Sequence, residues 1–159
     1  MFRSLVDINL TGSFLMCQAI GRHIIATQPS GSQASIGPAP QRCSMVLIAS
    51  MSSSIVNYPQ EQCAYNASKA GVIQLAKNLA TEWARYSIRV NCISPGYMDT
   101  ALNRVPALNA QKKIWIENTP AKRLGAVDEL NNLAVFLASE GSSFMTGANC
   151  IIDGGYSLW

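Results

Sequence analysis

The sequence has one histidine and no closely paired cysteines, and both features exclude classes of chemistry. His23 lies in an apolar helical stretch beside Ile24 and Ile25, where a surface or partly buried helix position explains it better than catalysis. A Ser-His-Asp or Cys-His mechanism would have to use this one residue, so we set those mechanisms aside. The five cysteines are odd in number, widely spaced and never in a C-x-x-C pair. They argue against a disulfide framework and against a zinc site.

Charged residues and long apolar runs are also scarce. Asp, Glu, Lys and Arg make up 13% of the 159 residues, and 12 basic against 9 acidic side chains give a net charge of +3. The basic residues are scattered, so we expect no nucleic-acid partner. The apolar run Met45–Ala49 is far shorter than a bilayer span, and Asp7 and Asn9 interrupt the apolar stretch that a signal peptide would need. We therefore expect a cytoplasmic protein with no membrane partner.

The sequence does contain an alternation of helical patterns and short apolar runs. Helices are expected at 4–27, at 62–85, from Asp128 onward and, as either a helix or a loop, at 107–118. Buried strands are expected at 44–50 and 88–94, and a last strand is expected at 149–153. Strands that alternate with helices predict an α/β fold with a parallel sheet and right-handed crossovers. Three strands are about half of a doubly wound nucleotide-binding sheet, which has about six.

Residues 28–42 interrupt this alternation with three prolines, two glycines and three serines. This composition predicts a loop, and fifteen residues is long for a connection within a compact domain. The segment is either a surface insertion, which costs little closure entropy, or an unspliced intron that has been translated. We expect one truncated domain over residues 1–159, with a loop insertion at 28–42.

The segment Tyr65-Asn66-Ala67-Ser68-Lys69 places a phenol and an ammonium four residues apart, on one face of a helix. A nearby ammonium stabilises a phenolate, which makes Tyr65 a candidate acid/base. Taken alone, such a pair is more often an exposed helical pair with no role. The position of Ser52 favours a catalytic role for Tyr65. Ser52 follows the first predicted strand, and the carboxyl ends of parallel strands line the usual ligand crevice. Pro95-Gly96 and Thr100 follow the next strand in the same way.

Six short motifs occur in order along nearly the whole chain. They are Asp7-Ile-Asn-Leu-Thr-Gly12, Ile48-Ala-Ser-Met-Ser52, Tyr65-x-x-x-Lys69, Ile88-Arg-Val-Asn91, Ser94-Pro-Gly96 and Asp153-Gly-Gly155. Each is weak alone, but in this order they resemble the short-chain dehydrogenase/reductase family. The resemblance implies an incomplete Rossmann-like fold, a doubly wound parallel sheet whose second half is present and whose glycine-rich N-terminal half is missing.

The resemblance also implies a catalytic tetrad of Asn9, Ser52, Tyr65 and Lys69. In the family's scheme, Tyr65 is the acid/base and Ser52 orients the substrate carbonyl. Lys69 binds the nicotinamide ribose and tunes Tyr65, while Asn9 supports a water-mediated proton relay. The implied cofactor is NADP or NAD, with NADP favoured. The implied cofactor-binding residues are Tyr65, Lys69, Pro95, Gly96, Met98 (through its backbone) and Thr100.

The finer pattern over 48–72 and the ending Asp-Gly-Gly-Tyr-Ser-Leu-Trp are similar to fungal ketose and sugar-alcohol reductases of the mannitol or sorbose type. This similarity implies a small-molecule carbonyl or alcohol substrate. The family further implies a homo-oligomer that pairs through the tyrosine-bearing helix, where Leu75, Leu79 and Trp83 are available for burial.

The chain departs from the family in having no G-x-G sequence. The family's Thr-Gly-x-x-x-Gly-x-Gly turn brings backbone close to the pyrophosphate at a helix N-terminus. Thr11-Gly12 and Thr146-Gly147 begin in the same way, but Met16 and Ile151 stand where the next glycine belongs. Two hypotheses stay open. One is an NAD(P)-dependent oxidoreductase with a Ser-Tyr-Lys mechanism, and the other is a catalytically inactive remnant that acts, if at all, through self-association.

Overall fold

A three-stranded parallel sheet forms the centre of the fold. The computed structural model describes residues 1–27 and 43–159, so the predicted loop at 28–42 lies outside the described residues. The described strands are β1 (Cys43–Ile48), β2 (Ile88–Pro95) and β3 (Asn149–Ile152), in the order β1-β2-β3. Both strand pairs are parallel, with Ile48 beside Ile93 and Pro95 beside Ile152. The predicted α/β class and parallel sheet are confirmed.

The helices are α1 (Phe2–Val6), α2 (Gly12–Ala26), α3 (Cys63–Trp83), α4 (Asn109–Asn118) and α5 (Asn131–Ala138). A π-helical turn, Asp7–Thr11, joins α1 to α2, so the first predicted helix is one continuous run. The open choice at 107–118 is settled in favour of a helix, α4. The helix expected from Asp128 begins as a 3-10 turn, Val127–Leu130, before α5.

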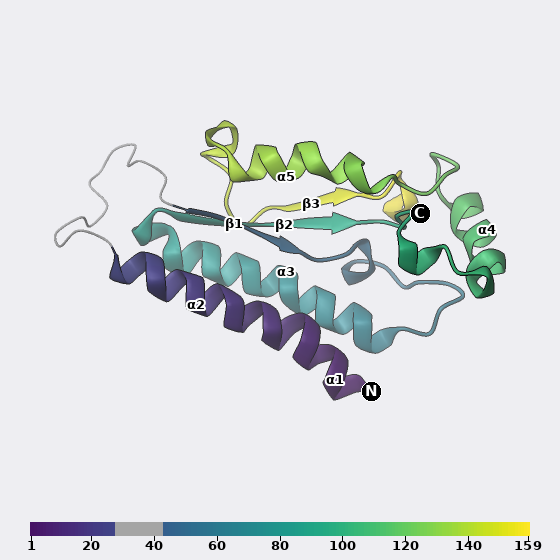
Figure 1. Ribbon diagram of the computed structural model, residues 1–159, viewed down its shortest axis with the longest axis horizontal. Helices are drawn as coiled ribbons and strands as arrows, with labels where there is room; N and C mark the ends of the chain where they lie inside the picture. Colours follow the sequence, from purple (N-terminus) through teal and green to yellow (C-terminus); the bar gives the residue numbers. More distant parts are fainter. Residues whose placement is uncertain (28–42) are drawn as a thin grey trace.

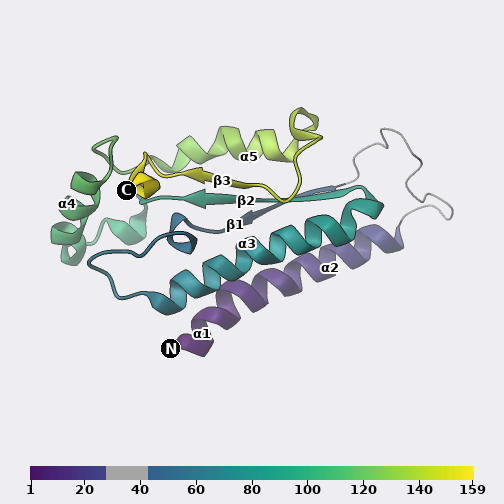
Figure 2. The same ribbon diagram turned by 180° about the vertical axis from the view of Figure 1, so that it is seen from behind.

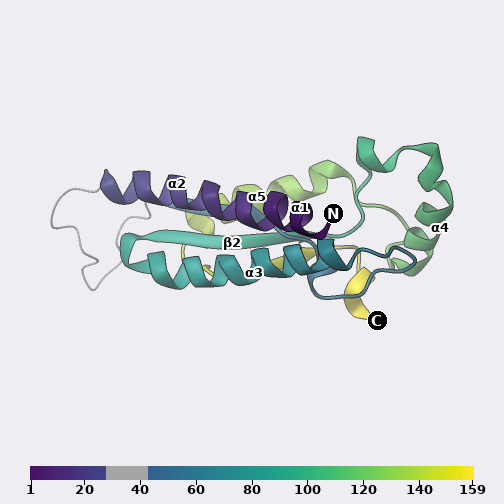
Figure 3. The ribbon, with the colours of Figure 1, turned by 90° about the horizontal axis from the view of Figure 1, so that it is seen from below.

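Helices cover both faces of the sheet. α1, α2 and α3 lie along one face and α5 lies along the other (Figure 1), and the view from behind shows the same layers (Figure 2). α2 and α3 run side by side, as the view from below shows (Figure 3). α4 lies beyond the end of the sheet toward which the strands point, near the C-terminus (Figure 1). The residues that follow β1 and β2 therefore meet α4 at this end.

The hydrophobic core lies between α3 and the sheet. Val72, Ala76 and Leu79 are each at most 4% exposed and share one face of α3. Trp83 packs against α2, where a Cβ on Gly21 would lie 2.7 Å from the indole ring. Leu79 is thus buried inside the chain, and the expectation that it is available for pairing between copies is wrong. Leu75 and Trp83 are half-buried, so their part in such pairing stays a prediction. Sequence periodicity identifies an apolar helix face but does not say which element covers it.

The α1–α2 run carries apolar side chains that no described residue covers. They include Phe2, Ile8, Phe14, Leu15, Met16 and Ile20, which are between 38% and 70% exposed. β1 and β3 are the edges of the described sheet. Exposed apolar surface and open strand edges both favour association. Among the described helices, none has the length and apolar content needed to cross a bilayer.

We expect the chain to self-associate through the α1–α2 surface. Multi-angle light scattering over a concentration series should give a mass above that of the 17.1 kDa monomer. Leu15→Lys combined with Met16→Lys should shift the mass toward the monomer, because both side chains are more than half exposed on α2. Phe144→Ser is a matched control, since Phe144 is fully exposed on the turn after α5. A well-folded monomer at high concentration would contradict this prediction.

Candidate active site

The carboxyl ends of β1 and β2 supply one wall of a pocket. After β1 the chain enters a 3-10 turn, Met51–Ser53, in which the Ser52 backbone N–H donates to Ser50 Oγ at 3.2 Å. Ser52 is 4% exposed. β2 ends at Pro95, and the next backbone N–H, that of Gly96, donates to the Ile152 carbonyl at 2.8 Å. The parallel register thus brings Ser52 and Gly96 to the same pocket.

The pocket has a volume of about 310 Å³ and contains the predicted acid/base. Ser52 and Tyr65 both line it, together with Tyr97 and Trp115. Gln62 Nε2 donates to Ser52 Oγ at 3.3 Å. Because this bond uses the serine oxygen as an acceptor, the hydroxyl proton of Ser52 remains able to reach a bound carbonyl. The structure therefore brings two of the four predicted tetrad residues into one pocket.

The other two tetrad residues, Asn9 and Lys69, line a separate groove. This groove has a volume of about 710 Å³ and lies between α2 and β1. Lys69 Nζ donates to the Ile48 carbonyl at 2.8 Å and lies 5.9 Å from the centroid of the Tyr65 ring. Burial lowers the pKa of Lys69 below its ordinary value, and Cys92 acts in the opposite direction with the lesser effect. Lys69 therefore stands beside Tyr65, in the neighbouring cavity.

Asn9 reaches the tyrosine through a serine. Its Nδ2 donates to Ser68 Oγ at 3.0 Å, and Ser68 Oγ donates to the Tyr65 carbonyl at 2.7 Å. Ser68 is fully buried on α3. Asn9 thus fixes the first turns of α3, and the water-mediated relay assigned to it by resemblance stays a prediction.

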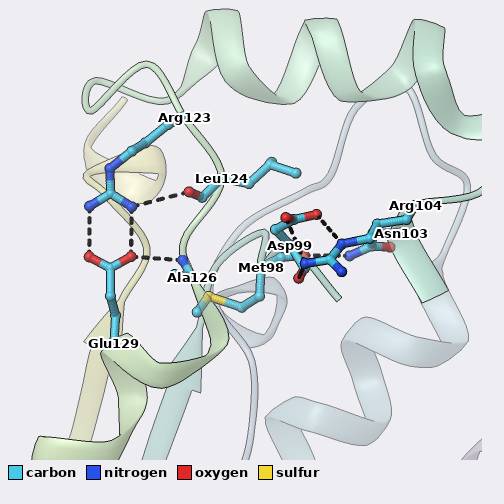
Figure 4. Close-up of polar contacts among 8 residues, drawn as sticks. All are labelled: Met98, Asp99, Asn103, Arg104, Arg123, Leu124, Ala126 and Glu129. Carbon is cyan, nitrogen blue, oxygen red and sulfur yellow. Dashed lines mark hydrogen bonds and ion pairs between the residues drawn. The ribbon is translucent and has the colours of Figure 1, made fainter. Parts of the chain in front are cut away.

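The segment after β2 holds the remaining predicted cofactor residues. Met98 is 9% exposed, and its carbonyl accepts hydrogen bonds from the Thr100 N–H and from Asn103 Nδ2, at 2.9 Å each. An ion pair between Arg104 and Asp99 closes this turn (Figure 4). Met98 and Thr100 therefore lie in an ordered turn next to the pocket, and their contact with a cofactor stays a prediction.

A second ion pair lies at the start of the 3-10 turn that precedes α5. Arg123 binds both carboxylate oxygens of Glu129, and the Ala126 N–H donates to the same carboxylate at 2.7 Å (Figure 4). These hydrogen bonds lower the pKa of Glu129 to about 2. The pair is exposed, so it contributes little to stability.

Sequence reasoning missed several residues of the pocket. The unpredicted lining residues include Gln62, Leu102, Asn103 and Trp115. Gln62 and Asn66 are four residues apart at the start of α3. This spacing was the one local sign in the sequence that their side chains meet on the helix face that also carries Tyr65. No local signal places Trp115, because it reaches the pocket only through the position of α4.

Comparison with known proteins identifies the family. A sequence profile described as enoyl-(acyl carrier protein) reductase, of the short-chain type, matches residues 1–157. The chain belongs to the short-chain dehydrogenase/reductase family. The family resemblance of the six motifs is thus confirmed.

Several curated members of the short-chain dehydrogenase/reductase family are similar to the chain. D-arabinitol 2-dehydrogenase (ribulose-forming) of Candida albicans is 44% identical over 98% of the chain and 52% of the relative. Sorbose reductase of Schizosaccharomyces pombe is 42% identical over 98% of the chain and 55% of the relative. NADH-dependent L-xylulose reductase of Ambrosiozyma monospora is 40% identical over 98% of the chain and 54% of the relative. The chain spans about half the length of the curated relatives it matches.

Solved structures of the family share the fold. A short-chain type dehydrogenase/reductase from Mycobacterium marinum has a TM-score of 0.85 and 38% identity, covering 99% of this chain and 57% of that one. A gluconate 5-dehydrogenase from Burkholderia cenocepacia, in complex with NADP and tartrate, has a TM-score of 0.83 and 35% identity, covering 99% and 56%. The Rossmann-like assignment is therefore confirmed for the part of the fold that this chain supplies.

The residues of this chain fit one part of a nicotinamide cofactor. In the α2–β1 groove, the amide of Asn9 and the ammonium of Lys69 are donors suited to ribose hydroxyls. Among the described residues that line the groove, Lys69 is the only charged side chain. The chain has no G-x-G turn to place backbone N–H groups against a pyrophosphate. This donor set would suit a ribose, and the chain contains no turn of that kind that would meet the phosphates.

We expect the isolated chain to bind NADPH or NADH more weakly than the low micromolar range. The reason is the missing set of backbone donors, which supply most of the pyrophosphate contacts in this fold. A titration that follows nicotinamide fluorescence measures the affinity directly. A low micromolar Kd for either cofactor would show that the chain holds the phosphates in another way.

We expect Gly96→Ala to destabilise the fold by about 1–3 kcal/mol, the usual range for overpacking. A Cβ at this position would lie 2.6 Å from Asp153 Cα, which is backbone and has little room to move. Urea unfolding measures the change. Gly12→Ala is the matched control, because its Cβ would meet nothing closer than 3.6 Å within a helix. That control should be neutral or stabilising, and an equally neutral Gly96→Ala would contradict the prediction.

Proposed function

We propose that the chain is the catalytic part of an NAD(P)-dependent oxidoreductase that interconverts a neutral ketose and the matching sugar alcohol. The single observation that carries this proposal is the lining of the Ser52–Tyr65 pocket. Its described lining residues include serine, glutamine, asparagine and aromatic side chains, and none of them is charged. An anionic sugar acid would find no cationic partner there, whereas a neutral polyol would need none.

Two amide oxygens in the pocket are suited to substrate hydroxyls. Gln62 uses its NH₂ group on Ser52 and Asn66, and Asn103 uses its NH₂ group on the Met98 carbonyl. Among the described residues, neither amide oxygen receives a hydrogen bond from the protein. Each is therefore free to accept a bond from a hydroxyl, and the rows of hydroxyls in a polyol supply such donors. The relatives named for arabinitol, sorbose and xylulose support this substrate class.

The proposed mechanism assigns a role to each tetrad residue. Ser52 Oγ donates a hydrogen bond to the substrate carbonyl oxygen, and the Tyr65 hydroxyl delivers a proton to the same oxygen during reduction. The Lys69 ammonium stabilises the phenolate that Tyr65 becomes, and it would hold the ribose of a bound cofactor. Asn9 holds the start of α3 through Ser68. A bound nicotinamide cofactor supplies the hydride in reduction and accepts it in oxidation.

The cofactor contacts and the assembly are part of the proposal. We propose NADP or NAD as the cofactor, with Pro95, Gly96, Met98 and Thr100 lining the nicotinamide end of its site. The relatives and neighbours include one named for NADH and one complexed with NADP, which supports the pair and favours neither. We propose one domain over 1–159 and a homo-oligomer that forms through exposed apolar surface.

Activity is best tested in a chimera. The part of the Candida albicans D-arabinitol 2-dehydrogenase that lies outside the matched region is joined ahead of this chain. The chimera should reduce D-ribulose with NADPH or NADH, followed at the absorbance of the reduced nicotinamide. Tyr65→Phe should lower kcat by about 10²–10⁴-fold, because the ring remains and the transferable proton is lost.

Tyr58→Phe is the matched control, since Tyr58 is 70% exposed and lies outside the pocket lining. It should leave kcat unchanged. Near-normal turnover in Tyr65→Phe would overturn the mechanism. A folded chimera that transfers no hydride to any ketose would overturn the proposed activity.

A second candidate is a catalytically inactive remnant that acts through self-association. It is favoured by the missing phosphate-binding turn in this chain and by the exposed apolar residues of α1 and α2. The same nicotinamide assay on the chain without the added half distinguishes the two functions. Turnover by the chain alone would exclude the remnant.

A further inference from the structure

One wall of the pocket is a pair of stacked aromatic rings from different parts of the chain. Tyr97 follows β2, and Trp115 lies in α4. Their ring centroids are 4.2 Å apart with an interplanar angle of 4°, and Tyr156 meets Tyr97 edge-on at 5.1 Å. Both Tyr97 and Trp115 line the pocket that contains Ser52 and Tyr65. The aromatic pair therefore forms part of the wall that faces Ser52 and Tyr65 across the pocket.

A single oxygen holds both rings. Gln60 Oε1 accepts a hydrogen bond from the Tyr97 hydroxyl at 3.0 Å and another from Trp115 Nε1 at 3.0 Å. Trp115 is 2% exposed, and a buried indole N–H without an acceptor is costly. Gln60 lies in the loop before α3, so its amide links this loop both to the segment after β2 and to α4. It does not itself line the pocket.

Amide side chains continue this connection to Ser52. Asn57 Nδ2 donates to the Tyr97 hydroxyl at 2.9 Å, and Asn57 Oδ1 accepts from Asn66 Nδ2 at 3.1 Å. Gln62 Nε2 then donates both to Asn66 Oδ1 at 3.1 Å and to Ser52 Oγ at 3.3 Å. An unbroken series of hydrogen bonds thus runs from the aromatic wall to the serine that would face the substrate.

We propose that Gln60 is a positioning residue for the sugar chain: it holds the Tyr97–Trp115 wall at the distance from Ser52 and Tyr65 that a hydroxylated carbon chain requires. This inference rests on the proposed ketose and sugar-alcohol substrate. A polyol fills the pocket along its length, so it depends on the wall. A small secondary alcohol such as 2-propanol needs only the Ser52–Tyr65 end. Gln60 therefore affects binding of the long substrate and not the proton transfer.

The first test uses the chain alone and measures binding of D-arabinitol. The indole N–H resonance of Trp115, assigned with Trp115→Phe, is followed by NMR during the titration. We expect a saturable shift in the original chain. Gln60→Leu should weaken the Kd by about tenfold or more, because the wall loses its shared acceptor. Gln60→Glu should bind within about threefold of the original, because a carboxylate accepts from both donors.

Gln74→Leu is the matched control, since Gln74 is exposed on α3 and away from the pocket. It should leave the Kd unchanged. Gln60→Asn, which keeps the amide but is one methylene shorter, replaces Gln60→Leu if the latter does not fold, and it should show the same loss. A Kd unchanged in these variants, or the absence of a saturable shift at Trp115 in the original chain, would overturn the inference.

The second test uses the chimera and separates KM from kcat. Gln60→Leu should raise the KM for D-arabinitol by about tenfold or more, with kcat and the oxidation of 2-propanol nearly unchanged. A loss of kcat on both alcohols would assign Gln60 to the chemistry and overturn the positioning role. The two proposals fail separately. An inactive chimera with Gln60-dependent arabinitol binding refutes only the activity, and an active chimera insensitive to Gln60 refutes only the positioning role.

Discussion

The central strand β2 determines where everything else in this structure can lie. It is hydrogen-bonded on both sides, and Ile88–Ser94 are all buried. Two of these buried residues are strongly polar, and each has partners. Arg89 donates to the Leu137 and Met145 carbonyls, while Asn91 donates to the Met145 carbonyl and accepts from the Ala148 N–H. Buried polar groups with good partners attach the 137–148 segment to β2, so β3 enters the sheet in register.

The parallel register of the sheet then divides the site between two cavities. The ends of β1 and β2 open into the Ser52–Tyr65 pocket, whereas the side of β1 that faces α2 opens into the groove with Asn9 and Lys69. Tyr65 and Lys69 are one helical turn apart on α3, so a single helix serves both cavities. The groove also runs along the whole of β1, which is an edge of the described sheet, so it borders an unpaired strand as well as Asn9 and Lys69.

The fold was predictable where the signal is local. The apolar face of α3 and the buried run of β2 follow from periodicity and length, and the residues after each strand follow from parallel topology. β1 was also expected to be buried, but within this strand only Met45 and Leu47 are, because β1 is an edge of the described sheet. The partners of an apolar face were not predictable in this way, and Trp83 illustrates the reason. The helical spacing of Trp83 indicates burial, but only the tertiary structure shows what covers it. The indole occupies the space that Gly21 on α2 leaves by having no side chain. Trp115 was missed for the same reason, since its role depends on the position of α4.

The hydrogen-bonded series from Trp115 to Ser52 is made of neutral groups alone. Its members are amides, one indole, one hydroxyl and the phenol of Tyr97, and burial raises the pKa of that phenol to about 12. None of these groups changes charge between acidic and mildly alkaline solution, and none is an ion pair that dissolved salt would weaken. The hydrogen-bonded series that holds the aromatic wall is therefore insulated from acidity and salinity. A pH profile of the protein then reports on the groups that exchange protons and not on this series.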